Sequence, residues 1–226
     1  MTDTLMIQWQ GALGITPAAL PVYCAGYAGR DQRGVRAHIE ELAKLGVPAP
    51  PRTPIFYRVS PTQVTTAGNI QVLGEQTSGE VEFAVFRLGG EDYVTVASDH
   101  TDREVEKTSI PQAKQLCPKV LAPHAWPVRQ VQDRWDALQL RSYISAADGS
   151  GRRLYQEGSA GSLMSLEELR GALQADTGAD PLMCLLLSGT IPVVGGEMVC
   201  AARFEMELVD PATGAALRHS YTIDTF

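Results

Sequence analysis

Glycine and proline interrupt this chain so often that long, unbroken elements have little room to form. The 226 residues include 21 glycines and 14 prolines. Short apolar segments lie between them, and several adjacent segments are separated by glycine-containing turns such as Gly89-Gly90. Two apolar segments joined by such a turn are typical of a β-hairpin. The pattern therefore predicts a β-rich protein built from many short strands.

Three segments depart from this pattern and predict helices. In residues 31–45, apolar side chains recur near helical spacing, and Asp31 stands where an N-cap residue is expected. Residues 166–173 are amphipathic and follow Ser165, a second candidate N-cap. Residues 101–116 have a partly helical pattern. We expect these helices to be few and short beside the strands.

Prolines mark a boundary between the first predicted helix and the strands. Residues 47–54 contain four prolines in eight positions, which is typical of an extended linker. We expect a small N-terminal cap over residues 1–53 and a main domain over residues 54–226. The main domain contains three predicted hairpins, formed by residues 81–88 with 93–97, 138–145 with 153–156, and 204–208 with 217–223.

Charge and composition argue against several functions. The chain has 19 lysine and arginine residues against 26 aspartate and glutamate residues, a net charge of −7, which is unlike a nucleic-acid-binding protein. The densest apolar run, residues 182–187, is far shorter than the roughly 20 residues that span a membrane. The first nine residues lack a signal-peptide pattern, and the four cysteines form no Cys-x-x-Cys pair. We expect a cytoplasmic protein without nucleic-acid or membrane partners and without structural zinc.

Glutamates separated by one residue occur three times, as Glu80/Glu82, Glu104/Glu106 and Glu205/Glu207. Residues two apart on a strand point to the same face, so such a pair places two carboxylates together. The third pair alternates with apolar residues before a turn, which is typical of a solvated strand face. The second pair opens a predicted helix, where acidic side chains suit the helix dipole.

The pair Glu80/Glu82 differs because it enters an otherwise apolar strand. The next strand ends with Asp99, and a hairpin between these strands would return Asp99 beside the pair. Carboxylates held together repel, and burial increases the cost unless a cation lies between them. Three carboxylates at two strand ends would form an open octahedral site for Mg²⁺ or Mn²⁺. A solvated strand face remains the alternative.

Four short motifs occur in order along the chain: Glu80-Val81-Glu82, residues 98–104, Lys114, and Gly189-Thr190. Their order and rough spacing resemble the fumarylacetoacetate hydrolase superfamily over about residues 54–210. Several positions within residues 98–104 depart from the family pattern, whereas Asp99 and Arg103 are retained. The whole is most similar to a bacterial branch of this superfamily that is catalogued as a domain of unknown function.

A further motif lies in the predicted cap. His38 and Glu41 form a His-x-x-Glu on the first predicted helix, followed by the proline-rich linker. Residues three apart share a helix face, so the imidazole and the carboxylate can pair. The superfamily resembled here has such a motif on a lid helix. A surface histidine with a helix partner is the alternative interpretation.

The resemblance implies an α+β, β-rich fold, a mixed β-sandwich or roll of the fumarylacetoacetate hydrolase C-terminal type with a small N-terminal helical cap, assembled as a homodimer. It implies a Mg²⁺- or Mn²⁺-dependent hydrolase that cleaves a C–C bond in a 2-oxo or 2,4-dioxo acid of the acylpyruvate type. The implied roles are metal ligation by Glu80, Glu82 and Asp99, catalysis by His38, Glu41 and Lys114, and substrate binding by Arg103, Gly189, Thr190 and His100.

Two other functions remain open at this point. A decarboxylase or tautomerase of a 2-oxo acid such as oxaloacetate would need the metal ion and the lysine but no activated water. A non-catalytic protein that binds a small carboxylate in the same pocket would also fit, because the residues around Arg103 differ from the family pattern.

Overall fold

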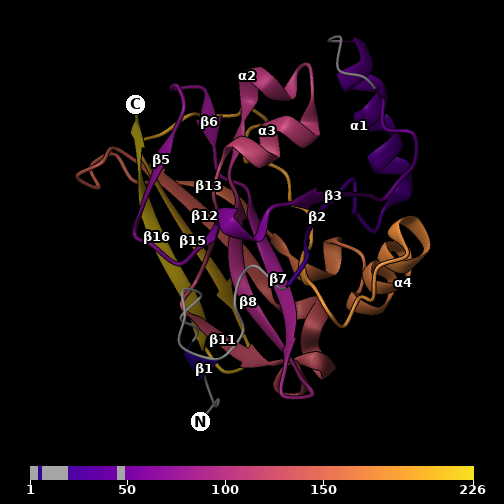
Figure 1. Ribbon diagram of the computed structural model, residues 1–226. Helices are drawn as coiled ribbons and strands as arrows, with labels where there is room; N and C mark the ends of the chain where they lie inside the picture. Colours follow the sequence, from indigo (N-terminus) through magenta and orange to yellow (C-terminus); the bar gives the residue numbers. More distant parts are fainter. Residues whose placement is uncertain (1–4, 7–19, 45–48) are drawn as a thin grey trace.

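Two β-sheets dominate the computed structural model, which describes residues 5–6, 20–44 and 49–226 (Figure 1). Within these residues, nine strands form the larger sheet. Seven of them lie in the order β1 (Leu5–Met6), β11 (His124–Pro127), β8 (Glu91–Asp99), β7 (Val81–Leu88), β14 (Leu185–Leu187), β2 (Val22–Gly26) and β3 (Ile55–Val59). The other two are β10 (Lys119–Leu121), which pairs with β8, and β4 (Val64–Thr65), which pairs with β10.

The smaller sheet lies beside β7 and β8 and has five strands in the described residues. Their order is β13 (Arg153–Ser159), β12 (Gln139–Ser145), β15 (Arg203–Val209), β16 (Ala216–Thr225) and β5 (Asn69–Val72). A third, short pairing joins β6 (Thr77–Ser78) to β9 (Thr101–Asp102).

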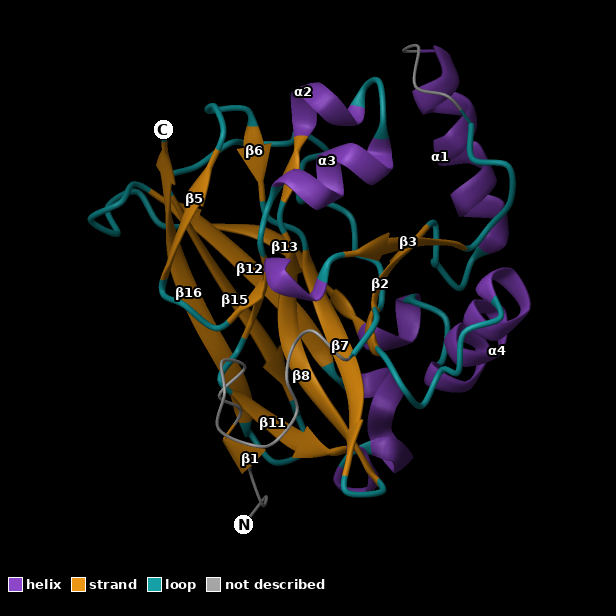
Figure 2. Cartoon of the chain, in the orientation of Figure 1, coloured by secondary structure: helices purple, strands orange, loops and turns teal. Residues whose placement is uncertain are grey.

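The helices lie at the outside of the strands (Figure 2). The α-helices are α1 (Gln32–Lys44), α2 (Arg103–Glu106), α3 (Ile110–Leu116) and α4 (Leu166–Thr177), and the remaining described helical segments are short 3-10 helices. None of the described helices is both long enough and apolar enough to cross a membrane. The result is a strand-rich α+β architecture, as predicted.

Alternate residues of β7 enter two different cores. Phe83 joins a buried cluster that also contains Leu140 and Phe204 of the smaller sheet. Ala84 and Phe86 point to the opposite face and join a second buried cluster. A strand that is buried on both faces has no solvent side on which to place charge. A carboxylate on β7 therefore needs partners inside the protein.

The predicted hairpins and helices are confirmed. β7 and β8 are joined at Gly89-Gly90, where both residues have positive φ (59° and 85°), the backbone that a tight hairpin turn requires. β12 pairs with β13, and β15 pairs with β16, both antiparallel. The helices predicted at residues 31–45 and 166–173 are α1 and α4, and α4 begins with a capping box between Ser165 and Glu168.

Strand β2 lies inside the larger sheet, although it precedes the predicted boundary at residue 53. It pairs in parallel with β14 and antiparallel with β3. The local pattern did not indicate β2, because its partner β14 comes much later in the chain. A separate cap over residues 1–53 stays a prediction. Helix α1 is its described helical part, but the side chains of His38 and Glu41 lie outside the described residues.

Candidate functional site

The register of the β7–β8 hairpin brings three predicted carboxylates together. Glu82 pairs with Ala97 in the β7–β8 ladder. Beyond this pair, Asp99 lies opposite Glu80, and the Asp99 amide donates to the Glu80 carbonyl oxygen at 3.1 Å. Strand alternation therefore turns Glu80, Glu82 and Asp99 to one face. One carboxylate oxygen from each residue lies within 4.8 Å of the others. Glu82 and Asp99 are buried, and Glu80 is partly buried.

Two lysine ammonium groups contact Asp99, one from α3 and one from β10. Lys114 Nζ lies 2.5 Å from Asp99 Oδ2 and 3.9 Å from Glu80 Oε2. Lys119 Nζ lies 2.8 Å from Asp99 Oδ1 and donates to the His100 carbonyl oxygen at 2.6 Å. Burial opposes ionisation of Asp99, but the two ammonium groups outweigh it and hold the pKa of this carboxyl well below its usual range.

The charge state of Lys114 follows from the same contacts. Burial by itself would lower the pKa of the ammonium group, but the charges of Asp99 and Glu80 raise this pKa well above its ordinary value. Lys114 is therefore a permanent cation at neutral pH, able to donate hydrogen bonds and to stabilise negative charge.

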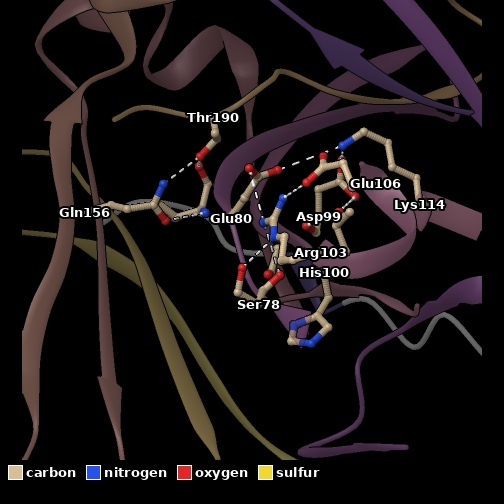
Figure 3. A network of polar contacts seen from close by, with 12 residues as sticks. Ser78, Glu80, Asp99, His100, Arg103, Glu106, Lys114, Gln156 and Thr190 are labelled. Carbon is tan, nitrogen blue, oxygen red and sulfur yellow. Dashed lines mark hydrogen bonds and ion pairs between the residues drawn. The ribbon is translucent and has the colours of Figure 1, made fainter. Parts of the chain in front are cut away.

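Arg103, at the start of α2, binds Glu80 from the other side (Figure 3). Its Nη2 lies 3.2 Å from Glu80 Oε1, and its Nη1 donates to Glu106 Oε2 at 2.8 Å. Its Nε donates to Ser78 Oγ at 2.7 Å. The planar guanidinium makes these contacts at once, which fixes the orientation of Glu80.

Glu82 is the member of the group without a cation of its own. Its Oε2 accepts a hydrogen bond from the Gly189 amide at 2.9 Å, and no described residue forms an ion pair with it. Burial, followed by the charge of Asp99, raises the pKa of Glu82 well above its ordinary value. A divalent cation between the three carboxylates would supply the missing positive charge. Oxygen donors of this kind are what Mg²⁺ and Mn²⁺ prefer, so the residues present fit the predicted metal.

The Gly189-Thr190 step holds Glu82 and β7 in place. Gly189 has a φ of 82°, and a Cβ at this position would lie 3.1 Å from the Ala25 carbonyl oxygen, so the step requires glycine. Thr190 Oγ1 donates to a backbone carbonyl oxygen of β7 at 2.9 Å and accepts from Gln156 Nε2 at 2.8 Å. Both residues therefore stand next to the carboxylates, and their contact with a substrate stays a prediction.

His100 follows Asp99 in the chain, but its ring points away from Glu80 and Lys114 (Figure 3). Its Nδ1 lies 3.0 Å from the Tyr221 hydroxyl, and its Nε2 lies 2.9 Å from Thr77 Oγ1. Burial, with help from two nearby cations, lowers the pKa of the imidazole to about 3, so the ring is neutral. The predicted substrate contact would require one of these two hydrogen bonds to break.

Sequence reasoning missed Lys119, the second cation on Asp99. Its signal is a single lysine inside the apolar residues 117–122, where it is completely buried. Lysine is almost never fully buried unless it is paired. A lone charged residue in an apolar strand therefore indicates a buried partner, which here is Asp99.

The comparisons with known proteins concern most of the chain. A family model described as Protein of unknown function (DUF2848) matches residues 25–221. No curated protein matches the chain. The structure of 2-keto-3-deoxy-D-arabinonate dehydratase complexed with magnesium and 2,5-dioxopentanoate is similar with a TM-score of 0.63 and 17% identity, over 92% of this chain and 74% of that chain.

Two further solved structures are similar to the same extent. Cg1458 with an inhibitor has a TM-score of 0.66 and 16% identity, over 92% of this chain and 78% of that chain. An uncharacterised protein from Mycobacterium abscessus has a TM-score of 0.60 and 17% identity, over 92% of this chain and 79% of that chain. At such low identity these similarities show the fold alone, and the predicted β-rich α+β class is confirmed.

The family model carries more weight because it is a match of sequence over most of the chain. The matched residues include the three carboxylates, Arg103, Lys114 and Gly189-Thr190. The chain therefore belongs to the family described as Protein of unknown function (DUF2848).

Proposed function

We propose that this protein is a Mg²⁺- or Mn²⁺-dependent enzyme of the fumarylacetoacetate hydrolase superfamily that acts on a 2-oxo acid. The observation that carries the proposal is the buried group of Glu80, Glu82 and Asp99 with the charged Lys114 against it. The fold shared with a dehydratase complexed with magnesium and 2,5-dioxopentanoate supports the same class of chemistry.

The residues divide the work of binding an oxo acid. When bound, the metal ion supplies a Lewis acid for the 2-oxo group and the adjacent carboxylate. Lys114 donates to the oxo oxygen as negative charge develops there. Arg103 holds Glu80 in the orientation that metal binding needs, and the Gly189 amide does the same for Glu82. The Thr190 hydroxyl hydrogen is already donated to β7, so the backbone amide of Thr190 is the group that we propose holds the substrate carboxylate.

Hydrolytic C–C cleavage of an acylpyruvate is the reaction we propose first. His38 takes a proton from water, with Glu41 orienting the imidazole. The water oxygen bonds to the distal carbonyl carbon, and the C–C bond breaks with its electron pair passing to the pyruvate enolate. Protonation of that enolate gives pyruvate, and the other fragment leaves as a carboxylic acid. In this reaction α1 acts as a lid that brings His38 over the site, while β2 stays in the larger sheet.

Dehydration of a 2-keto-3-deoxy acid is the second candidate, because the fold is shared with 2-keto-3-deoxy-D-arabinonate dehydratase. A proton leaves C3 to give the enolate of the intact substrate, and hydroxide then leaves C4 and takes up a proton as water, so no attacking water is needed. Decarboxylation or tautomerisation of oxaloacetate would also pass through an enolate of a 2-oxo acid. His38 is therefore the residue that separates hydrolysis from the other reactions.

A substrate panel with Mg²⁺ or Mn²⁺ tests the proposal. Release of pyruvate is measured with acylpyruvates, and release of CO₂ is measured with oxaloacetate. Loss of water is measured with a 2-keto-3-deoxy sugar acid. Hydrolysis that disappears in His38→Ala, while Mg²⁺ affinity is unchanged, supports the first candidate. Undiminished hydrolysis in that variant would remove water activation from His38. Metal-dependent ligand binding without any product would identify a binding protein instead.

The proposed homodimer has its own measurement. Light scattering on the purified protein should give the mass of two chains, and the mass of one chain would contradict a dimer.

A further inference from the structure

The segment between β2 and α1 contains a tyrosine in a backbone conformation that tyrosine rarely adopts. Tyr27 has a φ of 57°, and it is the one non-glycine residue with positive φ in the described part of the chain. For a bulky side chain this region is a conformational outlier. Such outliers persist where surrounding contacts hold them, and they cluster at ligand-binding sites.

Backbone contacts hold the chain on both sides of Tyr27. Before it, Gly26 pairs with Ile55 in the β2–β3 ladder. After it, the Ala28 carbonyl oxygen accepts a hydrogen bond from the Met164 amide at 2.9 Å. Because both flanks are fixed, the strain at Tyr27 is built into the fold rather than confined to a loose loop.

This strained turn packs directly on the glycine that binds a metal ligand. A Cβ on Gly189 would lie 3.1 Å from the Ala25 carbonyl oxygen and 3.2 Å from Ala28 Cβ, the residues on either side of the turn. The Gly189 amide donates to Glu82. The residues that flank Tyr27 therefore pack against Gly189, and Gly189 in turn binds Glu82.

The other side of the turn faces Tyr57 and Lys114. A Cβ on Gly26 would lie 2.9 Å from the Tyr57 ring, and Lys114 Nζ lies 5.8 Å from the centre of that ring. Burial, followed by the charge of Glu106, raises the pKa of Tyr27, so its hydroxyl stays protonated and able to donate. No described residue forms a hydrogen bond with this hydroxyl, although the side chain is partly buried.

We propose that Tyr27 is a substrate-binding residue whose phenol hydroxyl donates a hydrogen bond to a carboxylate or 2-oxo oxygen of the acid bound at Glu80, Glu82 and Asp99. This inference rests on the proposed function, since it assumes an oxo acid at the carboxylates. A tyrosine offers a rigid contact surface with one polar tip. A backbone that is already fixed lowers the ordering cost of binding, which explains why the strained conformation is kept.

Calorimetry with two probes tests the role of Tyr27. The full-length protein is titrated first with Mg²⁺ alone and then, in saturating Mg²⁺, with oxalate as a planar enolate mimic. Tyr27→Phe should leave the Mg²⁺ affinity unchanged and lower the oxalate affinity roughly ten- to hundredfold, as expected for one hydrogen bond to a charged ligand. Tyr93→Phe is the matched control, because it removes a phenol hydroxyl outside the site. That hydroxyl donates a hydrogen bond to Glu91 Oε2 at a distance of 3.1 Å. It should change neither affinity.

A second variant separates ligand binding from stability. Tyr27→Gly removes the ring and accepts the positive φ without strain, so its thermal midpoint should equal or exceed that of the wild type while oxalate affinity falls. A lower midpoint with unchanged oxalate affinity would make Tyr27 a structural residue. Wild-type affinity in Tyr27→Phe would overturn this inference alone. A wild-type protein that binds Mg²⁺ but not oxalate, or neither, would overturn the proposed function together with it.

Discussion

The same Glu-x-Glu pattern occurs at the start of β7, as Glu80 and Glu82, and on β15 in two different settings. On β15, Glu205 and Glu207 lie on the outer face of the smaller sheet, opposite the buried Phe204 and Met206. Each is neutralised by arginines: Glu205 by Arg152 at 2.9 Å and Arg203 at 3.3 Å, and Glu207 by Arg218 at 2.9 Å and Arg141 at 3.7 Å. On β7, Glu82 is buried and has one amide donor.

The difference shows that the neighbouring strands decide what the motif can do. The arginines around β15 come from β12, from β16, from β15 itself and from the turn before β13, and they pair with both carboxylates. The strand beside β7 supplies a third carboxylate, Asp99, and both nearby lysines contact Asp99 rather than Glu82. The β7 pair therefore retains an uncompensated buried carboxyl, which a divalent cation can neutralise.

The largest expected effect comes from removing the charge of Asp99. Asp99→Asn leaves the ammonium groups of Lys114 and Lys119 buried without their shared anion. Breaking a buried ion pair in this way should lower the free energy of unfolding by about 3–5 kcal/mol, measured by urea denaturation. The matched change Glu207→Gln on β15 should cost far less. Equal losses of unfolding free energy in Asp99→Asn and Glu207→Gln would mean that the carboxylates beside β7 and on β15 do not differ in their contribution to stability.

Acid should lower the free energy of unfolding through the buried His100. The pKa of His100 is about 3 in the folded state, below the value of 6.5 for an exposed histidine, so the unfolded state binds more protons between these values. The contribution of His100 to the free energy of unfolding is therefore complete above pH 6.5. It is lost as the pH falls towards 3, and the loss is roughly 3 kcal/mol at pH 4. Urea midpoints measured against pH should show this slope, and His100→Gln should flatten it. An unchanged slope in His100→Gln would assign the acid sensitivity to other groups.

Metal binding should depend on the β7 pair. Mg²⁺ at 100 times its dissociation constant should stabilise the wild type by about 2.7 kcal/mol. For a chain of this size that corresponds to a rise in the thermal midpoint on the order of 5–10 °C. Glu82→Gln should abolish the rise without lowering the metal-free midpoint, because it replaces a buried carboxyl of raised pKa with a neutral amide. Glu205→Gln should keep the full rise, and a rise that survives in Glu82→Gln would remove Glu82 from the ligand set.

The smallest effect should come from the β15 pair itself. Glu205→Gln with Glu207→Gln removes only partly exposed ion pairs, so the free energy of unfolding should fall by about 1 kcal/mol or less. Salt screens such pairs, and the difference from the wild type should shrink further in 1 M NaCl. Denaturation at low and high salt gives both numbers. A loss that is large and independent of salt would show that these glutamates behave like buried charges.

Much of the fold could be predicted because its signals are local. Gly89-Gly90 marks the β7–β8 turn, and Ser165 with Glu168 marks the start of α4. Strand β2 could not be predicted, because its position depends on pairing with β14 from a distant part of the chain. For the same reason, the proline-rich residues 47–54 indicated a boundary, while the sheet continues across it from β2 to β3.

The candidate site divides in the same way. Glu80, Glu82 and Asp99 were predicted because two strand ends and one turn are enough to bring them together. Lys119 was missed, and His100 was placed near the substrate because it follows Asp99. Its ring instead contacts Tyr221, which comes from the far end of the chain.

By itself the sequence determined that a tight hairpin would place three carboxylates on one face, because side-chain alternation and turn length depend only on neighbouring residues. Only the tertiary structure decided which of those carboxylates is neutralised and which is not. Burial and the distances to Lys114, Lys119, Arg103 and the Gly189 amide set the charge of each group, and these partners come from separate segments. Electrostatic free energy depends on position in space, which no local pattern specifies.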